Sequence, residues 1–198
     1  SLLEVMEEKQ VTVDGVTYKV PRPFMVLATQ NPVEYLGTYP LPEAQLDRFT
    51  LKINIGYPSL EDESQILERF KVDNPLVSLS PVADSQFILR LQETVKRVYV
   101  DKSLNNYIVA ITDATRKRED VLLGASPRGS LCLFRAAQAW AFYNGRDYVL
   151  PDDIKKMSVP VLSHRIILRQ EAKLRKVTDE DIIRSALNSV SIPLVASR

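Results

Sequence analysis

The sequence contains one cysteine and one histidine among its 198 residues. A single cysteine, Cys132, cannot form an internal disulfide or a thiolate metal cluster, and this cysteine usage favours a reducing compartment such as the cytoplasm. Because His164 is the sole histidine, a histidine-rich metal site is excluded, and we expect no metal ligands in these residues. No apolar run approaches the roughly 20 residues that a bilayer-spanning helix needs, so we expect no membrane segment.

Net charge is also nearly absent, since 26 Lys and Arg residues face 25 Asp and Glu residues. This balance gives no reason to expect a nucleic-acid partner or an electrostatic membrane anchor. Hydrophobic residues make up 45% of the sequence, which supplies an ordinary core and excludes low-complexity disorder. The first ten residues are acidic and amphipathic, unlike a signal peptide, and they open without Met on a pattern typical of mid-helix. We therefore expect the chain to be part of a longer protein.

The first 58 residues have an α/β pattern. The segment Val11–Val20 alternates around Asp14-Gly15, which predicts a β-hairpin with a type I′ turn. Phe24–Ala28 is a continuous apolar run of strand length, typical of a strand buried in a parallel sheet. A short helix ending near Phe49 and a second strand at Thr50–Pro58 complete half of an α/β unit.

After Pro58 the pattern becomes helical. Six helical stretches are predicted, each opened by a capping residue or by a proline suited to the first turn. They begin near Ser59, Ser85, Asp101, Ser126, Pro151 and Thr178. We therefore expect two parts, an α/β part at 1–58 and an all-α bundle at 59–198, and a chain that is mostly helical overall.

Asn31 lies just past the carboxyl end of the predicted strand Phe24–Ala28, in the turn that ends at Pro32. In open α/β sheets, ligands bind outside the carboxyl ends of the strands, where an Asn amide can orient a water and touch a phosphate oxygen. The alternative is that Asn31 only shapes the turn before Pro32, and spacing alone favours this alternative.

Two arginines are further candidates for phosphate contact. Arg48 lies at a helix-to-strand junction, from which it could reach a neighbouring subunit as an arginine finger; the alternative is an ion pair with Asp47, Glu43 or another acid. Arg128 lies at a predicted helix N-terminus, which attracts anions, and its alternative is a solvated position in the first turn.

The remaining reactive side chains are expected to be structural. His164 stands between Ser163 and Arg165, where a structural hydrogen bond is favoured over a function. Cys132, Phe134 and Trp140 fall on the fourth helical stretch and are expected to pack within the bundle. The basic cluster at 116–118 is followed at once by two acids, which favours a solvated loop over a grip on nucleic acid.

Three segments together resemble the MoxR family of AAA+ ATPases: Leu2–Gly15, Ala28–Phe49 and Gly124–Leu131. The resemblance implies the C-terminal part of a P-loop AAA+ core, with a β-hairpin and two parallel strands, followed by a helical lid from about residue 59. It implies that Asn31 is the sensor-1 residue, Arg48 the arginine finger and Arg128 the sensor-2 arginine, and that these three contact nucleotide.

The sequence departs from the family in one respect. No G-x-x-x-x-G-K-[ST] loop (Walker A) occurs in the 198 residues, and no hydrophobic strand ends in Asp-Glu (Walker B). Those elements cradle the phosphates and position Mg²⁺ in P-loop NTPases. We therefore expect ATP and Mg²⁺ to be cofactors of the longer parent, and the chain alone to bind nucleotide weakly or not at all.

Two functions from different classes remain open. The resemblance implies an ATP-hydrolysing chaperone that forms a homo-oligomeric, hexameric ring and remodels client proteins, including von Willebrand A-domain proteins and metalloenzymes. The alternative is a non-catalytic helical protein-interaction module, which the missing phosphate loop favours for the isolated chain. A DNA-translocating role receives no support from the near-neutral charge.

Overall fold

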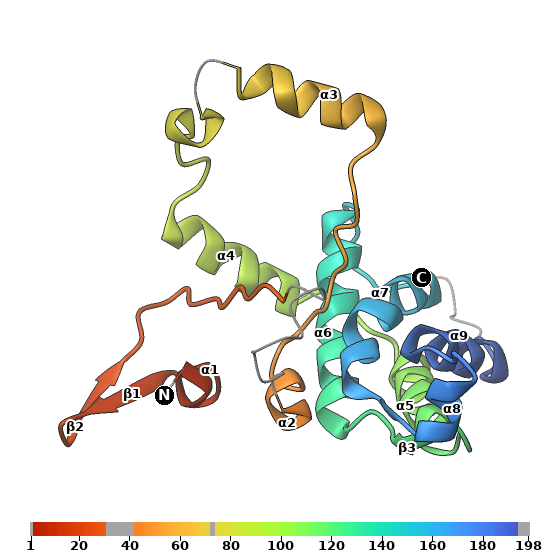
Figure 1. The fold of residues 1–198 in the computed structure, drawn as a ribbon. Coiled ribbons are helices and arrows are strands. Elements are labelled where there is room, and N and C mark those ends of the chain that lie inside the picture. Colours follow the sequence, from red (N-terminus) through yellow and green to blue (C-terminus); the bar gives the residue numbers. More distant parts are fainter. Residues whose placement is uncertain (1, 31–41, 72–73, 194–198) are drawn as a thin grey trace.

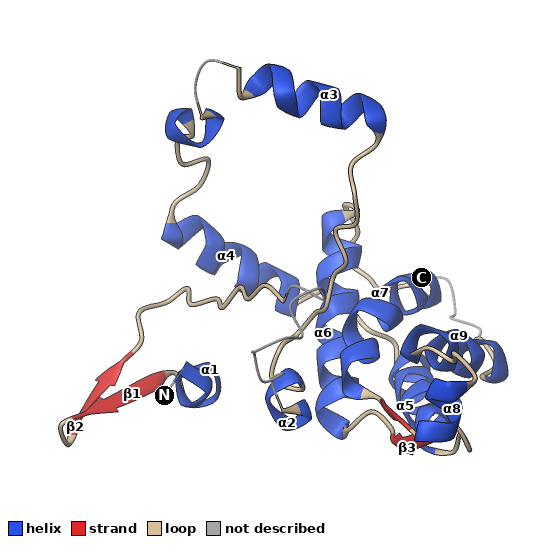
Figure 2. Ribbon diagram, viewed as in Figure 1, coloured by secondary structure: helices blue, strands red, loops and turns tan. Residues whose placement is uncertain are grey.

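The computed structural model describes residues 2–30, 42–71 and 74–193 (Figure 1). Within these ranges the chain is mostly helical, with two small antiparallel sheets (Figure 2). Asn31 lies outside the described residues. The elements in chain order are α1 (Leu2–Glu8), β1 (Gln10–Val13), β2 (Val16–Lys19), α2 (Glu43–Leu46), α3 (Leu60–Arg69), η1 (Pro75–Ser78), α4 (Ser85–Lys96), α5 (Lys102–Arg116), β3 (Val121–Leu123), α6 (Pro127–Tyr143), α7 (Pro151–Leu162), η2 (Ser163–Arg165), β4 (Ile167–Leu168), α8 (Gln170–Leu174) and α9 (Asp179–Ser189).

The hydrophobic core lies in a bundle of α5, α6, α7 and α9. Helix α6 packs on α7, and α5 packs on both α6 and α9 (Figure 1). Burial of apolar surface is the main stabilising contribution of such a bundle. The large aliphatic side chains that have almost no exposed surface come from all four helices: Leu104, Ile111, Leu133, Ile154, Leu162 and Ile183.

Local capping explains where the predicted helices begin. Ser59, Asp84 and Asp101 each accept a hydrogen bond from a backbone N–H in the first turn of the following helix. Thr178 and Asp181 form a reciprocal capping box at the start of α9. These bonds satisfy donors that a helix leaves unpaired, and they fix the start of four of the six predicted helical stretches; the other two, α6 and α7, begin with a proline in the first turn.

The predicted hairpin is confirmed. Strands β1 and β2 pair antiparallel, and Val13 lies opposite Val16 across the two-residue turn. Asp14 and Gly15 both have positive φ, at 52° and 78°, as a type I′ turn requires.

The two parallel strands predicted at 24–28 and 50–58 are not formed. Both segments run without regular structure, and most of their apolar side chains stay exposed, with Leu27 at 85% and Ile55 at 91%. A strand exists only when a neighbour accepts its backbone hydrogen bonds, and no described residue offers these two segments a partner strand.

The first helix after residue 58 does not join the bundle. Helix α3 buries none of its side chains, and Figure 1 shows it apart from the other helices. Helix α4 returns the chain to the bundle and packs against α6. The helical bundle predicted for residues 59 onward therefore has its packed core in α5, α6, α7 and α9, with α3 outside it.

Candidate functional site

Arg165 fastens the segment around Arg48 to the bundle. Its side chain is only 1% exposed, and its guanidinium points from η2 toward the segment that follows α2. Nη2 donates to the carbonyl of Asp47 at 3.0 Å and to the carbonyl of Phe49 at 2.5 Å, while Nη1 donates to the carbonyl of Thr50 at 3.3 Å. The carbonyls on both sides of Arg48 are thus bound by one buried cation.

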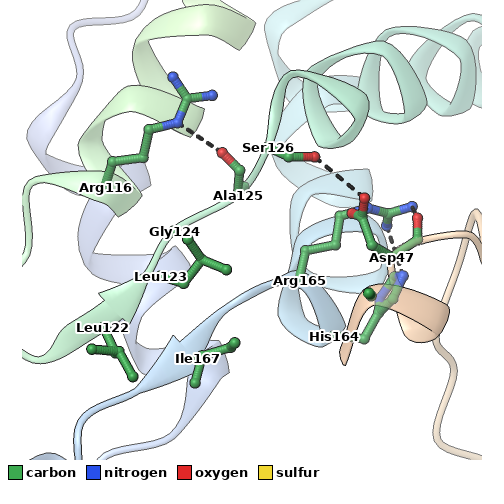
Figure 3. A pocket seen from close by; sticks show the side chains of 11 residues that line it. Asp47, Arg116, Leu122, Leu123, Gly124, Ala125, Ser126, His164, Arg165 and Ile167 are labelled. Carbon is green, nitrogen blue, oxygen red and sulfur yellow. Dashed lines mark hydrogen bonds and ion pairs between the residues drawn. The ribbon is translucent and has the colours of Figure 1, made fainter. Parts of the chain in front are cut away.

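Asp47 supplies the opposite charge. Its Oδ1 lies 3.0 Å from Nε of Arg165, yet the N–H does not align with it, so this contact is a charge pair and the hydrogen bonds of Arg165 go to carbonyls. Ser126 Oγ, at the start of α6, donates to Oδ2 of Asp47 at 3.4 Å (Figure 3). Burial lowers the pKa of Arg165, but a guanidinium remains charged in proteins.

His164 makes the structural contact that its sequence neighbours predict. Its Nε2 lies 2.9 Å from the carbonyl of Phe49 and 2.7 Å from Nη1 of Arg165. Burial lowers the pKa of His164 to about 4, with the charge of Arg165 acting in the same direction, so the ring is neutral at pH 7. A neutral ring either donates to Phe49 through Nε2–H or accepts from Arg165 at Nε2, depending on its tautomer.

The two predicted phosphate-contacting arginines meet on one carboxylate. Arg48 pairs through Nη1 with Oε2 of Glu7, and Nη1 of Arg128 lies 3.3 Å from Oε1 of the same side chain. Arg48 thus forms an ion pair with Glu7 of α1, and Asp47, which the sequence offered as a local partner, forms its ion pair with Arg165. These side chains keep 28% (Arg48), 36% (Arg128) and 48% (Glu7) of their surface exposed, so all three are partly open to solvent.

A pocket of about 510 Å³ lies between α2, the loop before α6, and η2 (Figure 3), and neither Arg48 nor Arg128 is among its lining residues. Leu122, Leu123 and Ile167 make its apolar wall, and Asp47, His164 and Arg165 make its polar end. The loop is held against α5 because Arg116 Nε donates to the carbonyl of Ala125 at 2.7 Å.

Gly124 makes the close approach of this loop possible. A Cβ at Gly124 would lie 2.7 Å from both the N and Cα atoms of Arg116, which no real side chain tolerates. The basic cluster at 116–118 therefore contributes Arg116 to a structural contact, beyond the solvated loop that the sequence predicts.

Sequence reasoning singled out Arg48 and Arg128 but missed the residues that place them. Glu7, Asp47, Ser126 and Arg165 are ordinary polar residues far apart in the sequence, and no spacing rule connects them. The available signal was the apolar sequence on both sides of His164 and Arg165, which includes Leu162 and Ile166 and indicates a buried position. Among the described residues, no three His, Cys, Asp or Glu side chains gather closely enough to hold a metal ion. In the same part of the chain, none of the helices combines the length and apolar character of a membrane span.

Two protein families match separate parts of the sequence. Residues 1–51 match the ATPase family associated with various cellular activities (AAA), and residues 113–186 match the AAA lid domain. Together they include Arg48 in the first match and Arg128 and Arg165 in the second. The AAA lid match thus covers the bundle from the end of α5 through most of α9.

Similar proteins extend the match to nearly the whole chain. An uncharacterized protein, YeaC, of Bacillus subtilis is 48% identical over 197 residues, which cover 100% of this chain and 62% of YeaC. The chaperone MoxR1 of Mycobacterium tuberculosis is 43% identical over 204 residues, which cover 98% of this chain and 54% of MoxR1.

A solved structure agrees with these sequence matches. The crystal structure of a putative ATPase from Cytophaga hutchinsonii superposes with a TM-score of 0.91 at 42% identity, covering 98% of this chain and 61% of that one. The chain therefore spans between about half and two thirds of the length of these relatives. The family matches, the similar proteins and the lid-type bundle agree, and the chain belongs to the MoxR family of AAA+ ATPases.

Proposed function

We propose that the protein carrying this chain is a cytoplasmic, ring-forming AAA+ ATPase that couples ATP hydrolysis to the remodelling of client proteins. The observation that supports this proposal best is the convergence of Arg48 and Arg128 on the carboxylate of Glu7. A carboxylate and a phosphate both offer oxygen acceptors of negative charge, and the planar fork of Arg fits either. The residues present therefore suit a phosphate group.

In this proposal the two arginines act on the same phosphate. Arg48 is the arginine finger that a subunit presents to the nucleotide of its neighbour, where it stabilises negative charge in the transition state of phosphoryl transfer. Because Arg128 reaches the same carboxylate as Arg48, it acts on that neighbouring nucleotide too. Asn31, as sensor 1, would orient the attacking water in its own subunit.

ATP and Mg²⁺ supply the phosphoryl group and neutralise its charge when they are bound. The role assigned to this chain is to contact the γ-phosphate through Arg48 and Arg128, and the metal is assigned to other residues of the full-length protein. Hexameric rings and clients with von Willebrand A-domains are part of the same proposal.

The experiment measures ATP turnover and ATP binding of the full-length protein with Arg48→Ala. We expect turnover to fall by roughly 10³–10⁵, as loss of an arginine finger does in GTPases, while ATP affinity stays close to that of the unaltered protein. Arg48→Lys is not expected to restore turnover, since a point charge does not reproduce the fork.

Arg184→Ala is the matched control, because Arg184 is an exposed arginine of α9 that pairs with Glu180 of the same helix. Unchanged turnover in Arg48→Ala would overturn the proposed role and favour a non-catalytic interaction module. Mixed rings extend the test: subunits with Arg48→Ala and subunits with a disabled phosphate-binding loop should together recover activity if Arg48 acts on the neighbour.

A further inference from the structure

Arg165 is the most deeply buried charged side chain near the site, and the proposed function does not use it. It belongs to η2, which follows α7 directly in the helical bundle. Apart from contacts with Val161 and His164 in its own turn and with Cys132, its bonds leave the bundle and reach the segment 47–50. A buried cation needs such partners, because an unpaired one is very costly.

The bonds of Arg165 bracket Arg48. One nitrogen, Nη2, holds the carbonyls of Asp47 and Phe49, the residues immediately before and after Arg48. His164 adds a second contact to the Phe49 carbonyl at 2.9 Å. The backbone of Arg48 is therefore fixed on both sides to η2, while its side chain keeps 28% of its surface exposed.

A further hydrogen bond joins this segment to the bundle beyond the contacts of Arg165. The backbone N–H of Lys52 donates to the carbonyl of Pro160 in α7 at 2.8 Å, so the segment is held to the bundle at a second place. The short helix α2 also packs against η2. Polar contacts with the bundle are thus made by four residues of the segment 43–52, at positions 47, 49, 50 and 52.

Helix α6 has a glycine where the Arg165 side chain packs against it. A Cβ at Gly129 would lie 3.2 Å from Cδ of Arg165, which is tighter than ordinary contact, so the absence of a side chain there leaves room for the buried chain. Nη2 of Arg165 also lies 3.4 Å from Sγ of Cys132 on the same helix. Because α6 carries Arg128 in its first turn, Arg165 contacts both the helix that holds Arg128 and the segment that holds Arg48.

We infer that Arg165 is a positioning residue that ties the arginine finger Arg48 to the helical lid of its own subunit, so that the finger moves with the lid. This inference rests on the role proposed for Arg48. When nucleotide changes the position of the lid in one subunit, the finger presented to the neighbouring site moves with it. The contact between Arg165 and the 47–50 segment thereby carries information about nucleotide from one site to the next.

Lysine cannot replace Arg165 in this role. The guanidinium offers five donors in a rigid fork, and these reach several carbonyls in different directions. An ammonium group keeps the charge opposite Asp47, but its three donors share one nitrogen, so it does not reproduce the two separate nitrogens from which Arg165 reaches the carbonyls of Asp47, Phe49 and Thr50. Arg165→Lys therefore loosens the bracket while it keeps a cation in the site.

The test uses mixed rings of the full-length protein, assembled from donor and acceptor subunits. Donors have a disabled phosphate-binding loop and an intact Arg48, and acceptors carry Arg48→Ala, so the recovered ATP turnover reports finger donation alone. With Arg165→Lys in the donors, we expect recovered turnover to fall by about tenfold to a hundredfold, since small misplacements of a catalytic group cost that much. With Arg165→Lys in the acceptors, we expect little change, because their finger is already absent.

Arg146→Lys in the donors is the matched control. Arg146 pairs with the buried Asp153 inside the bundle and does not touch the 47–50 segment. This variant perturbs a comparable bundle ion pair, so it should leave finger donation nearly unchanged. Thermal unfolding of all subunits shows whether the variants are folded before mixing.

Each outcome decides the inference. Equal losses with Arg165→Lys in donors and acceptors, or no loss in donors, would overturn the positioning role. If Arg165→Lys subunits do not enter rings, His164→Ala in the donors replaces them, and unchanged recovery would count equally against the inference. No recovery with unaltered Arg165 in rings shown by mass to be mixed would instead reject the proposed action of Arg48 on its neighbour, on which the inference depends.

Discussion

Nε of Arg165 lies 3.0 Å from Oδ1 of Asp47, although 118 positions separate the two residues in the sequence. This pair joins the helical bundle to the residue immediately before Arg48. The charge on Asp47 offsets the cost of burying the guanidinium, and the carbonyls of residues 47, 49 and 50 take its hydrogen bonds. A local segment that lacks a sheet to hold it is thus positioned by a distant helical turn.

Glu7 competes with phosphate for the two arginines, so Glu7→Gln should raise the ATP turnover of the full-length protein. Exposed ion pairs contribute about 0.2–1 kcal/mol each, so the two pairs of Glu7 together limit the expected rise to about thirtyfold. Added salt screens the pair, so the difference between variant and unaltered protein should shrink at high ionic strength. Glu8→Gln is the control, since Glu8 contacts Gln10 and neither arginine has a bond to it among the described contacts. Lower turnover in Glu7→Gln would show that Glu7 supports the arginines instead.

Asn31→Ala and Arg128→Ala should differ in their effects on nucleotide binding by the full-length protein. Asn31, as a sensor of water and γ-phosphate, should affect turnover with little change in ADP affinity, because ADP lacks the group it contacts. Arg128→Ala should alter the ratio of ATP to ADP affinity as well as the rate, since a ligand shifts a conformational balance only by its differential affinity. Calorimetry and steady-state hydrolysis measure both. Equal weakening of ATP and ADP by Asn31→Ala would favour the turn-shaping alternative, and an Arg128→Ala variant without any change would favour a solvated helix position.

Gly124→Ala should destabilise the chain, because its Cβ would lie 2.7 Å from backbone atoms of α5 that cannot yield. Overpacking of this kind costs about 1–3 kcal/mol, measurable by urea unfolding. The same shift would displace the loop that leads to Ser126 and Arg128, so turnover of the full-length protein should fall as well. Gly145→Ala is the comparison: its Cβ would meet nothing within 4 Å, but its φ of 74° is strained for alanine. That variant should lose stability without losing turnover beyond its loss of folded protein.

Acidification should weaken the chain through His164. Its pKa in the folded state is about 4, against an ordinary value of 6.5, so between these pH values the unfolded chain binds a proton that the folded chain does not. His164 therefore adds no penalty above about pH 6.5, and the folded state loses stability as pH falls from 6.5 toward 4, with a slope of at most about 1.4 kcal/mol per pH unit. Arg165 and Lys52 oppose protonation of His164, and Asp47 favours it.

The measurement compares urea unfolding of the chain and of its His164→Gln variant at pH 7 and pH 5. Other groups titrate equally in both proteins, so the free-energy difference between them isolates His164. This difference should shrink at the lower pH. A difference that stays constant with pH would mean that the ring is not held neutral in the folded state.

Local chemistry in the sequence was enough to predict most of the helices and the hairpin. Ser59, Asp84, Asp101 and Thr178 cap helices through bonds that span only two or three residues, and Asp14-Gly15 sets the turn between β1 and β2. Such interactions depend on neighbours in the chain, so they can be read from order alone. Arg48 and Arg128 were also recognisable, because their segments resemble a known family.

Only the tertiary structure decided what holds those arginines and what became of the predicted strands. Residues 24–28 and 50–58 have the composition of buried strands, but strand pairing requires a partner, and the described residues provide none. The contacts of Arg165 with Asp47 and of Glu7 with Arg48 and Arg128 join positions that no periodicity relates. The contacts of Arg165 form because packing of α6, α7 and η2 buries a cation that must find acceptors, and that requirement exists only once the helices have assembled.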